Sequence, residues 1–100
     1  MQPASSLDVQ SFVLQWLARY REYPRAARHA HLEGTVLVRI VLMPDGRLVM
    51  RHLIQSSGHD LLDRAALELI ERASPVQLPA DNGLTDPVEL QLPLIYRLSA

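Results

Sequence analysis

Four histidines are the residues of this sequence whose side chains could most readily hold a metal ion. His29 and His31 stand two positions apart in a segment expected to be helical, so they point to different faces and cannot chelate one ion well. His52 and His59 have no cysteine and no cluster of carboxylates beside them. The spacing therefore predicts neither a metal site nor any other cofactor.

The run Ser56-Ser57-Gly58 precedes a helical segment, which is where a phosphate-binding turn would lie. It is too short for a P-loop and no lysine follows it, so we interpret it as a strand end followed by a helix cap. Four aspartates occupy turns and a helix start, where the side chain serves the backbone: Asp45, Asp60, Asp63 and Asp86. No Ser-His-Asp arrangement can be assembled from these positions, and the sequence does not indicate an enzyme.

The composition is that of one folded domain of 100 residues, with 48% hydrophobic and 21% charged residues. Ten basic and eleven acidic residues give a net charge of −1, which argues against nucleic-acid and anionic-membrane binding. The chain has no cysteine, so disulfides and thiolate chemistry are excluded. It shows neither a signal peptide nor an apolar run of the roughly 20 residues that a membrane span needs. If the protein works outside the cytoplasm, we expect the segment that directs it there to be missing and Met1 to be added or retained.

The first third of the chain is expected to be helical. Apolar residues at helical spacing predict a first helix from the serines at 5–6 to about Arg21, which must end before Pro24. A second, short helix is expected over residues 24–32, with Pro24 at its first position. Gly34 then follows as a left-handed terminator.

The remaining segments alternate between strand and helix patterns. They are a strand over 35–43, a tight turn at Pro44-Asp45-Gly46, a strand over Leu48–Gln55, a helix over Asp60–Ala73 and a strand over Val88–Leu98. A hairpin followed by a returning helix predicts an α+β fold in two layers. Its three-stranded antiparallel sheet has strand order 2-1-3, with helices on one face and element order ααββαβ.

The last strand is the most informative segment. Its even positions from Val88 to Leu98 are all apolar, which places their side chains on the core face. Pro93 has no N–H and belongs on an edge strand with its nitrogen facing outward. The backbone groups of Gln91, Ile95 and Arg97 are expected to point outward with it. Such an edge is either protected against aggregation or kept open for a partner strand, and the pattern alone favours protection.

A ferredoxin-like RNA-binding domain is an alternative for this order of elements. It would need aromatic residues on the sheet and a basic surface. The chain has a single phenylalanine, Phe12, in a helix, and no excess of basic residues. Phe12, Trp16 and Tyr20 form a line at helical spacing, which we interpret as core packing, with a dimer or partner-helix contact as the lesser alternative.

Seven short motifs occur in the order that they take in TonB C-terminal domains, over about residues 16 to 98. They are Tyr23-Pro24 with Arg25-Ala26-Ala27-Arg28, Leu32-Glu33-Gly34-Thr35-Val36-Leu37-Val38, Pro44-Asp45-Gly46-Arg47-Leu48, Ser56-Ser57-Gly58, Leu62-Asp63-Arg64-Ala65-Ala66, Ser74-Pro75 and Leu92-Pro93-Leu94-Ile95-Tyr96-Arg97-Leu98. Each motif alone is weak, since any hairpin can use Asp-Gly. Together, the chain resembles this family, and we divide it into an N-terminal helix, 1–22, and a core, 23–98.

The resemblance implies a periplasmic domain of an inner-membrane-anchored energy transducer, whose anchor this sequence lacks. Members use the proton-motive force through an ExbB–ExbD complex to open outer-membrane transporters for siderophores, haem or cobalamin. They bind the TonB box and plug of these transporters, and the TonB box adds a strand to the sheet edge. The implied partner-binding residues are Gln91, Leu92, Pro93, Leu94, Ile95, Tyr96, Arg97 and Leu98, with Arg19, Arg21, Glu22, Tyr23 and Pro24 on the approach. This approach lacks the Gln-Pro pair that some relatives carry before Tyr-Pro.

A second hypothesis remains beside this one. The chain could be a generic periplasmic interaction domain, or a small homodimer that pairs its own edge strands. The two hypotheses differ in what the outward N–H of Ile95 contacts, a transporter segment or a second copy of the chain.

Overall fold

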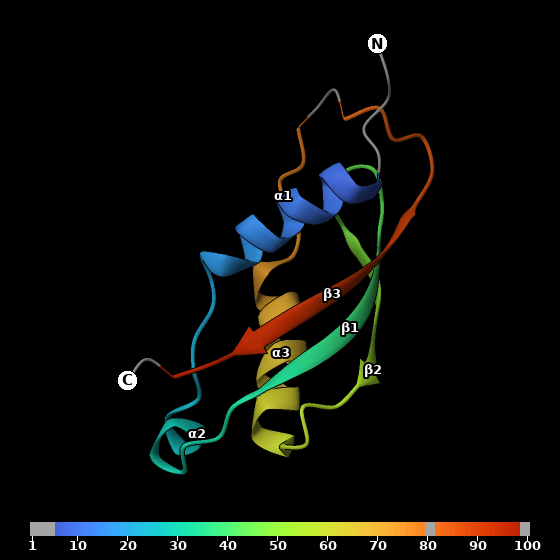
Figure 1. Ribbon diagram of the computed structural model, residues 1–100. Helices are drawn as coiled ribbons and strands as arrows, with labels where there is room; N and C mark the ends of the chain where they lie inside the picture. Colours follow the sequence, from blue (N-terminus) through green and yellow to red (C-terminus); the bar gives the residue numbers. More distant parts are fainter. Residues whose placement is uncertain (1–5, 80–81, 99–100) are drawn as a thin grey trace.

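The computed structural model describes residues 6–79 and 82–98 and has six elements around one sheet (Figure 1). In chain order they are α1 (Ser6–Ala18), α2 (Arg25–His29), β1 (Gly34–Leu42), β2 (Leu48–Gln55), α3 (Asp60–Ala73) and β3 (Val88–Tyr96). The strands pair antiparallel in the order β2-β1-β3, and α1 and α3 lie on one face of the sheet. The predicted fold class, strand order and element order are confirmed.

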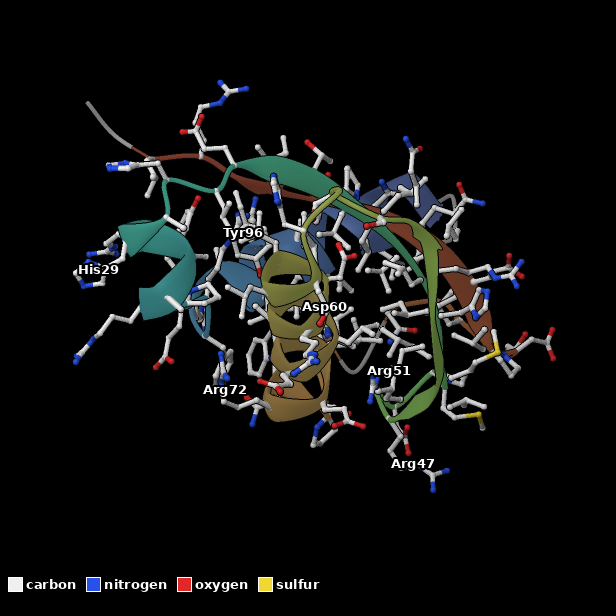
Figure 2. The ribbon with its side chains drawn as sticks, turned by 90° about the horizontal axis from the view of Figure 1, so that it is seen from below. His29, Arg47, Arg51, Asp60, Arg72 and Tyr96 are labelled. Carbon is white, nitrogen blue, oxygen red and sulfur yellow. The ribbon has the colours of Figure 1, made fainter. Side chains whose placement is uncertain are left out.

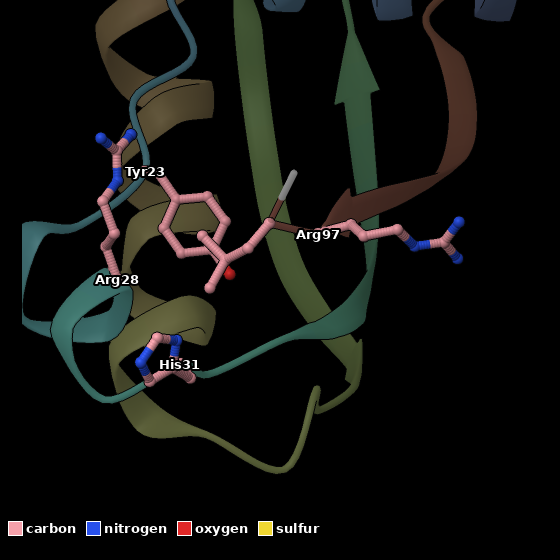
Figure 3. Close-up of a pocket in the computed structure, with 5 residues that line it drawn as sticks. Tyr23, Arg28, His31 and Arg97 are labelled. Atoms are coloured by element: carbon pink, nitrogen blue, oxygen red, sulfur yellow. The ribbon is translucent and has the colours of Figure 1, made fainter. Parts of the chain in front are cut away.

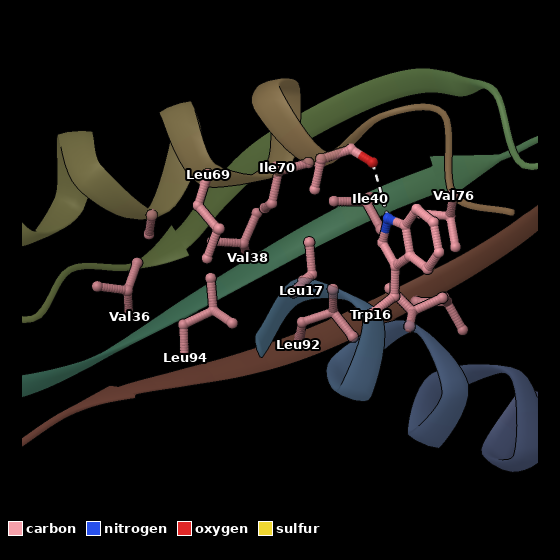
Figure 4. Packing of buried hydrophobic residues seen from close by; sticks show 14 of the residues in the cluster. Trp16, Leu17, Val36, Val38, Ile40, Leu69, Ile70, Val76, Leu92 and Leu94 are labelled. Carbon is pink, nitrogen blue, oxygen red and sulfur yellow. Dashed lines mark hydrogen bonds between the residues drawn. The ribbon is translucent and has the colours of Figure 1, made fainter. Parts of the chain in front are cut away.

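The core lies between the sheet and the two long helices (Figure 4). Alternate residues of β1 and β3 face it, because side chains alternate across a strand. α1 contributes Val9, Val13, Trp16 and Leu17, which share one helical face. The indole N–H of Trp16 donates to the Ala73 carbonyl at 2.8 Å, so it satisfies one of the free carbonyls at the end of α3. Trp16 therefore packs in the core, as predicted, and joins the two helices. Of the other residues in the predicted line, Phe12 is partly buried against the core, while Tyr20 is exposed, so the prediction was wrong for Tyr20.

Both N-terminal helices are shorter than the sequence predicts. α1 ends at Ala18, about three residues before the predicted end, since the next bonds, from Arg19 N–H to Trp16 and from Tyr20 N–H to Leu17, are tighter i→i−3 turns. α2 begins after Pro24, which takes the capping position and not the first helical one. The predicted spans to Arg21 and over 24–32 were therefore too long.

The predicted role of Gly34 as a left-handed terminator was wrong. His31 takes the positive φ, at 55°, and Gly34 is the first residue of β1. A glycine is still required there, because a Cβ would lie 2.9 Å from both the Cβ and the carbonyl oxygen of Ser57. Close approach of two backbones, and not turn geometry, explains this residue.

The β1–β2 turn is fixed by the loop that follows α3. Gly46 has φ 91°, as expected of the Asp-Gly turn, and its carbonyl accepts the Val76 N–H at 3.0 Å. A Cβ at Gly46 would lie 1.7 Å from the Val76 carbonyl oxygen. The turn and the loop therefore fit together only with a glycine at this position.

Ser56 and Ser57, which follow β2, contact the first turn of α3 through Asp63 and do not act as a simple helix cap. His59 occupies the capping position and makes no side-chain cap. The carboxylate of Asp63, one turn into α3, accepts bonds from the Ser57 N–H at 2.9 Å, the Ser57 hydroxyl at 2.8 Å and the Ser56 hydroxyl. Burial alone would raise the pKa of Asp63, but these bonds to its charged form lower the pKa below its ordinary value.

Candidate functional site

β3 forms one outer edge of the sheet and pairs with β1 without a register shift. Nine residue pairs run from Gly34↔Tyr96 to Leu42↔Val88. The even residues Leu90, Leu92, Leu94 and Tyr96 are buried, and the odd residues from Glu89 to Ile95 are exposed. The predicted alternation is therefore confirmed within the strand.

The position of Pro93 indicates where the backbone groups of β3 point. In an antiparallel ladder the bonded pairs alternate with non-bonded pairs. Pro93 cannot donate, so Leu37↔Pro93 has to be a non-bonded pair in this unbroken ladder. Leu92 and Leu94 then pair inward with β1, and the backbone N–H groups of Gln91 and Ile95 face away from it. The side chain of Ile95, 50% exposed, lies on the outer face of the sheet.

The strand ends two residues earlier than predicted. β3 stops at Tyr96, so Arg97 and Leu98 follow it and do not extend the ladder. One reason is that the Leu98 N–H donates to the Glu33 carboxylate at 2.6 Å and not to a strand. The part of the predicted edge that keeps strand geometry is Gln91 to Tyr96.

The segment after α1 packs against the end of β3. The guanidinium of Arg21 lies 4.6 Å from the ring centroid of Tyr96, and the ring of Tyr23 meets Tyr96 edge-on at 5.6 Å. Both geometries are favourable for aromatic rings. Figure 2 shows Tyr96 on the side of the molecule toward His29 of α2 and away from Arg47 of the β1–β2 turn. The structure thus brings together two predicted groups of residues that are more than 70 positions apart in the sequence.

Not every predicted approach residue lies at this place. The guanidinium of Arg19 lies over Trp16 instead, 5.2 Å from its ring centroid. Glu22 is exposed, and Pro24 is half-buried ahead of α2. Of the approach residues, only Arg21 and Tyr23 stack on the end of β3.

The two tyrosines at the end of β3 remain neutral near pH 7. Burial raises the pKa of Tyr96, and the positive charge of Arg21 offsets part of this effect. Partial burial and the nearby Glu33 carboxylate raise the pKa of Tyr23, whose hydroxyl donates to the Leu32 carbonyl. The rings therefore act as an uncharged platform between arginines.

Open cavities border this platform, and Figure 3 shows one of them. One of about 400 Å³ is lined by Tyr23, Arg28, His31, Arg97 and Leu98. A second of about 400 Å³ is lined by Arg21, Tyr23, Arg28, Ile95, Tyr96 and Arg97, so it borders the outward side of β3. In Figure 3 the side chain of Arg97 extends away from Tyr23, while Arg28 lies beside the ring.

Sequence reasoning missed the part that α2 plays at this site. Arg25 and Arg28 line the cavities around Tyr23, and the guanidinium of Arg28 lies 5.9 Å from the Tyr23 ring centroid. Their spacing of three on a short helix puts both on one side, which was a usable signal. The bond between Glu33 and Leu98 had no signal in the sequence.

The described parts of the chain contain neither a cluster of metal-ligating side chains nor a helix that could span a membrane. No group of three His, Cys, Asp or Glu side chains within residues 6–79 and 82–98 could hold a metal ion. None of the described helices is long and apolar enough to cross a membrane.

Comparison with known proteins agrees with the fold and with the position of the motifs. The family model described as "Gram-negative bacterial TonB protein C-terminal" matches residues 19–98. Protein TonB of Pseudomonas putida is 37% identical over 90 residues, which are 89% of this chain and 37% of that protein. Protein TonB of Vibrio cholerae is 44% identical over 78 residues, which are 76% of this chain and 31% of that protein. The chain thus spans about a third of the length of these relatives.

Solved structures of similar domains superpose over most of the chain. The solution structure of Helicobacter pylori TonB-CTD (residues 179–285) has a TM-score of 0.74 and 24% identity, and covers all of this chain and 98% of its own. The structure of HasB CTD has a TM-score of 0.60 and 33% identity, covering 97% of this chain and 75% of its own. By its sequence and its fold, the chain belongs to the family of C-terminal domains of Gram-negative bacterial TonB proteins.

Proposed function

We propose that this chain is the transporter-binding domain of a TonB-type energy transducer, a binding module and not an enzyme. In this proposal it works in the periplasm as part of an inner-membrane-anchored protein that is driven through ExbB–ExbD. It grips the TonB box of outer-membrane transporters for siderophores, haem or cobalamin by adding the box as a strand to the edge of β3. The segment Arg19 to Pro24 lies on the approach to the transporter plug.

The observation that carries the proposal is the edge of β3 itself. Its backbone N–H groups at Gln91 and Ile95 face away from β1, and its register with β1 is continuous over nine pairs. An added strand bonds to such a row of groups without any rearrangement of the sheet. No comparable run of pairs exists on the β2 side, where the register shifts twice.

The expected affinity suits a device that pulls. Each backbone bond contributes about 0.5–1.5 kcal/mol net, so a handful of bonds, less the cost of ordering the peptide, predicts a dissociation constant on the order of micromolar. Force applied along the strands loads these bonds together. Weak binding in solution and resistance to pulling are therefore compatible.

The first test is an NMR titration of the domain with TonB-box peptides from several transporters of the same organism. We expect shifts on Gln91 to Tyr96 and near Tyr23, with one peptide preferred. The variant Ile95→Pro removes an outward N–H and should weaken binding by about 1 kcal/mol or more, roughly fivefold, because a bond is lost and the ring obstructs the edge. Absence of shifts with every peptide at millimolar concentration would overturn the proposal.

A matched control exists on the other edge of the sheet. The even residues of β1 form the bonded pairs with β3, so its odd residues Arg39 and Val41 form the bonded pairs with β2. Arg51 lies opposite the even residue Ile40, and its backbone N–H therefore faces away from β1. Arg51→Pro therefore removes an outward N–H from the wrong edge, and Arg51→Gln accounts for loss of its ion pair with Glu71. We expect neither to change peptide affinity. If Ile95→Pro alters only self-association, measured by sedimentation, the edge-paired homodimer is the correct function.

A further inference from the structure

The arginines of this chain differ in the partners that they contact. All ten basic residues are arginines. Four of them pair with carboxylates at 2.8–3.7 Å, Arg72 donates to the Tyr20 carbonyl at 2.6 Å, and the guanidinium of Arg19 lies over the ring of Trp16. The four pairs are Arg39–Glu89, Arg47–Asp45, Arg51–Glu71 and Arg64–Asp60.

The arginines at the end of β3 make no such pairs. Arg21, Arg25, Arg28 and Arg97, which we call the cationic end, have no carboxylate of the described residues within ion-pair distance. They line adjoining cavities around Tyr23. The acidic residues nearest in sequence are Glu22 and Glu33, and Glu33 already accepts the Leu98 N–H. Within residues 6–79 and 82–98, the positive charge at this place therefore has no carboxylate in an ion pair with it.

The geometry keeps these guanidinium groups available to a ligand. Arg21 lies over the ring of Tyr96 and Arg28 beside that of Tyr23. A guanidinium held on an aromatic ring loses some freedom but retains its in-plane N–H donors, which match the two oxygens of a carboxylate. Exposed arginines held in this way favour a carboxylate over a neutral group.

The cationic end lies where a strand added to β3 would leave the sheet. The cavity that holds Arg21 and Arg28 is also lined by Ile95 and Tyr96. A segment paired along Gln91 to Ile95 therefore reaches these arginines with its next residues. The positive charge of the cationic end therefore acts on the residues of the partner that come next to those paired with β3.

We propose that the cationic end, with Arg25 and Arg28 of α2 as its specificity-determining residues, selects partner segments that carry carboxylates next to the paired stretch. The carboxylates belong at the end of the partner that passes Ile95. The inference rests on the proposed strand addition to β3 and extends it, since it assigns α2 the choice among peptides that pair equally well with the edge.

The test uses the transporter peptide that binds in the titration, in three synthetic forms. One carries a pair of glutamates before the paired stretch, one carries the pair after it, and one has glutamines at both places. We expect one of the glutamate forms to bind about three- to tenfold more tightly than the glutamine form at low salt, and this ratio to shrink as salt is raised. Which glutamate form is preferred gives the direction of the added strand.

Two variants separate the cationic end from the overall charge of the domain. Arg28→Gln should bring the ratio of the two dissociation constants toward one. Arg47→Gln removes an exposed arginine from the β1–β2 turn and should leave the ratio unchanged. In Figure 2, Arg47 lies on the opposite side of the molecule from His29 of α2. Equal binding of all three forms, or an equal fall in the ratio for both variants, overturns the inference while the strand addition stands. Failure of every form to bind overturns both.

Discussion

The two edges of the sheet are built differently although both are exposed. β3 pairs with β1 through nine consecutive residues without a shift. β2 pairs through six, with register shifts that leave Val49 and Ile54 without a β1 partner. These two residues are 58% and 41% exposed, so the shifts place apolar side chains outside. Bulges of this kind bend a strand and increase its twist, so that a further strand cannot easily pair along its outer edge.

The proposed function implies that an exposed apolar residue is a poor guide to a binding edge. By side-chain exposure alone, β2 is the more apolar edge, with Val49, Met50 and Ile54. By backbone geometry, of these two edges only β3 presents a regularly spaced row of N–H and carbonyl groups to an added strand. Pro93 removes a single donor from that row and leaves those of Gln91 and Ile95, so it limits pairing without preventing it.

β2 is held at both ends by contacts with the segments around α3, and we interpret it as the structural edge. The Val76 backbone closes over Gly46 at its start, and Asp63 holds the serines at its end. The end of β3 contacts Arg21 and Tyr23 through Tyr96, but it also borders an open cavity.

Gly46→Ala should have the largest effect. The new Cβ would lie 1.7 Å from the Val76 carbonyl oxygen and would also force a residue with a side chain to φ 91°. We expect the free energy of unfolding to fall by about 3 kcal/mol or more, measured by urea denaturation. Gly58→Ala is the control, since it has φ 93° but nothing within 4 Å of its Cβ, and should cost only about 1 kcal/mol. Equal losses would show that the loop does not fix the turn.

Asp63→Asn should have the next largest effect. The carboxylate accepts bonds from Ser56 and Ser57, and weakening them should lower the free energy of unfolding by about 2 kcal/mol. Because the pKa of Asp63 is lower in the folded state, its stabilisation is complete above the ordinary value of 3.8 and is lost as the pH falls through the lower folded value.

Unfolding measured as a function of pH checks this prediction. The loss of stability with acid should be smaller in Asp63→Asn than in the wild type over the range below pH 3.8. Asp60→Asn is the control, because Asp60 makes only an exposed ion pair with Arg64. An identical acid limb in Asp63→Asn and the wild type would contradict the prediction.

The sequence predicted best the elements whose signals are local. β2 and α3 have the predicted bounds, because a turn, a capping region and a clear period enclose each of them. The alternation of β3 identified its buried face for the same reason. The edge position of β3 followed from Pro93 and the order of the elements.

What could not be predicted depends on contacts between distant segments. The two shifts in β2 arise from how the strand fits β1, and neither Val49 nor Ile54 carries a local signal for them. Gly34 is a glycine because of Ser57, which is more than twenty residues away. The end of α1 and the stacking of Arg21 on Tyr96 depend on where the chain docks after the helix. Sequence reasoning therefore found the edge but not the arginines of α2 beside it.

The smallest predicted effect compares two exposed isoleucines on opposite edges, Ile95 of β3 and Ile54 of β2. Replacing either with threonine keeps the β-branched shape and should change the free energy of unfolding by less than about 0.5 kcal/mol. On β3 the change removes apolar contact with the neighbouring side chains of an added strand, a pair contribution of about 0.2–1 kcal/mol. We therefore expect Ile95→Thr to weaken peptide binding roughly two- to fivefold and Ile54→Thr to leave it unchanged, measured by calorimetry at one salt concentration. A larger loss from Ile54→Thr would mean that the exposed apolar residues of β2, and not the regular backbone of β3, form the binding edge.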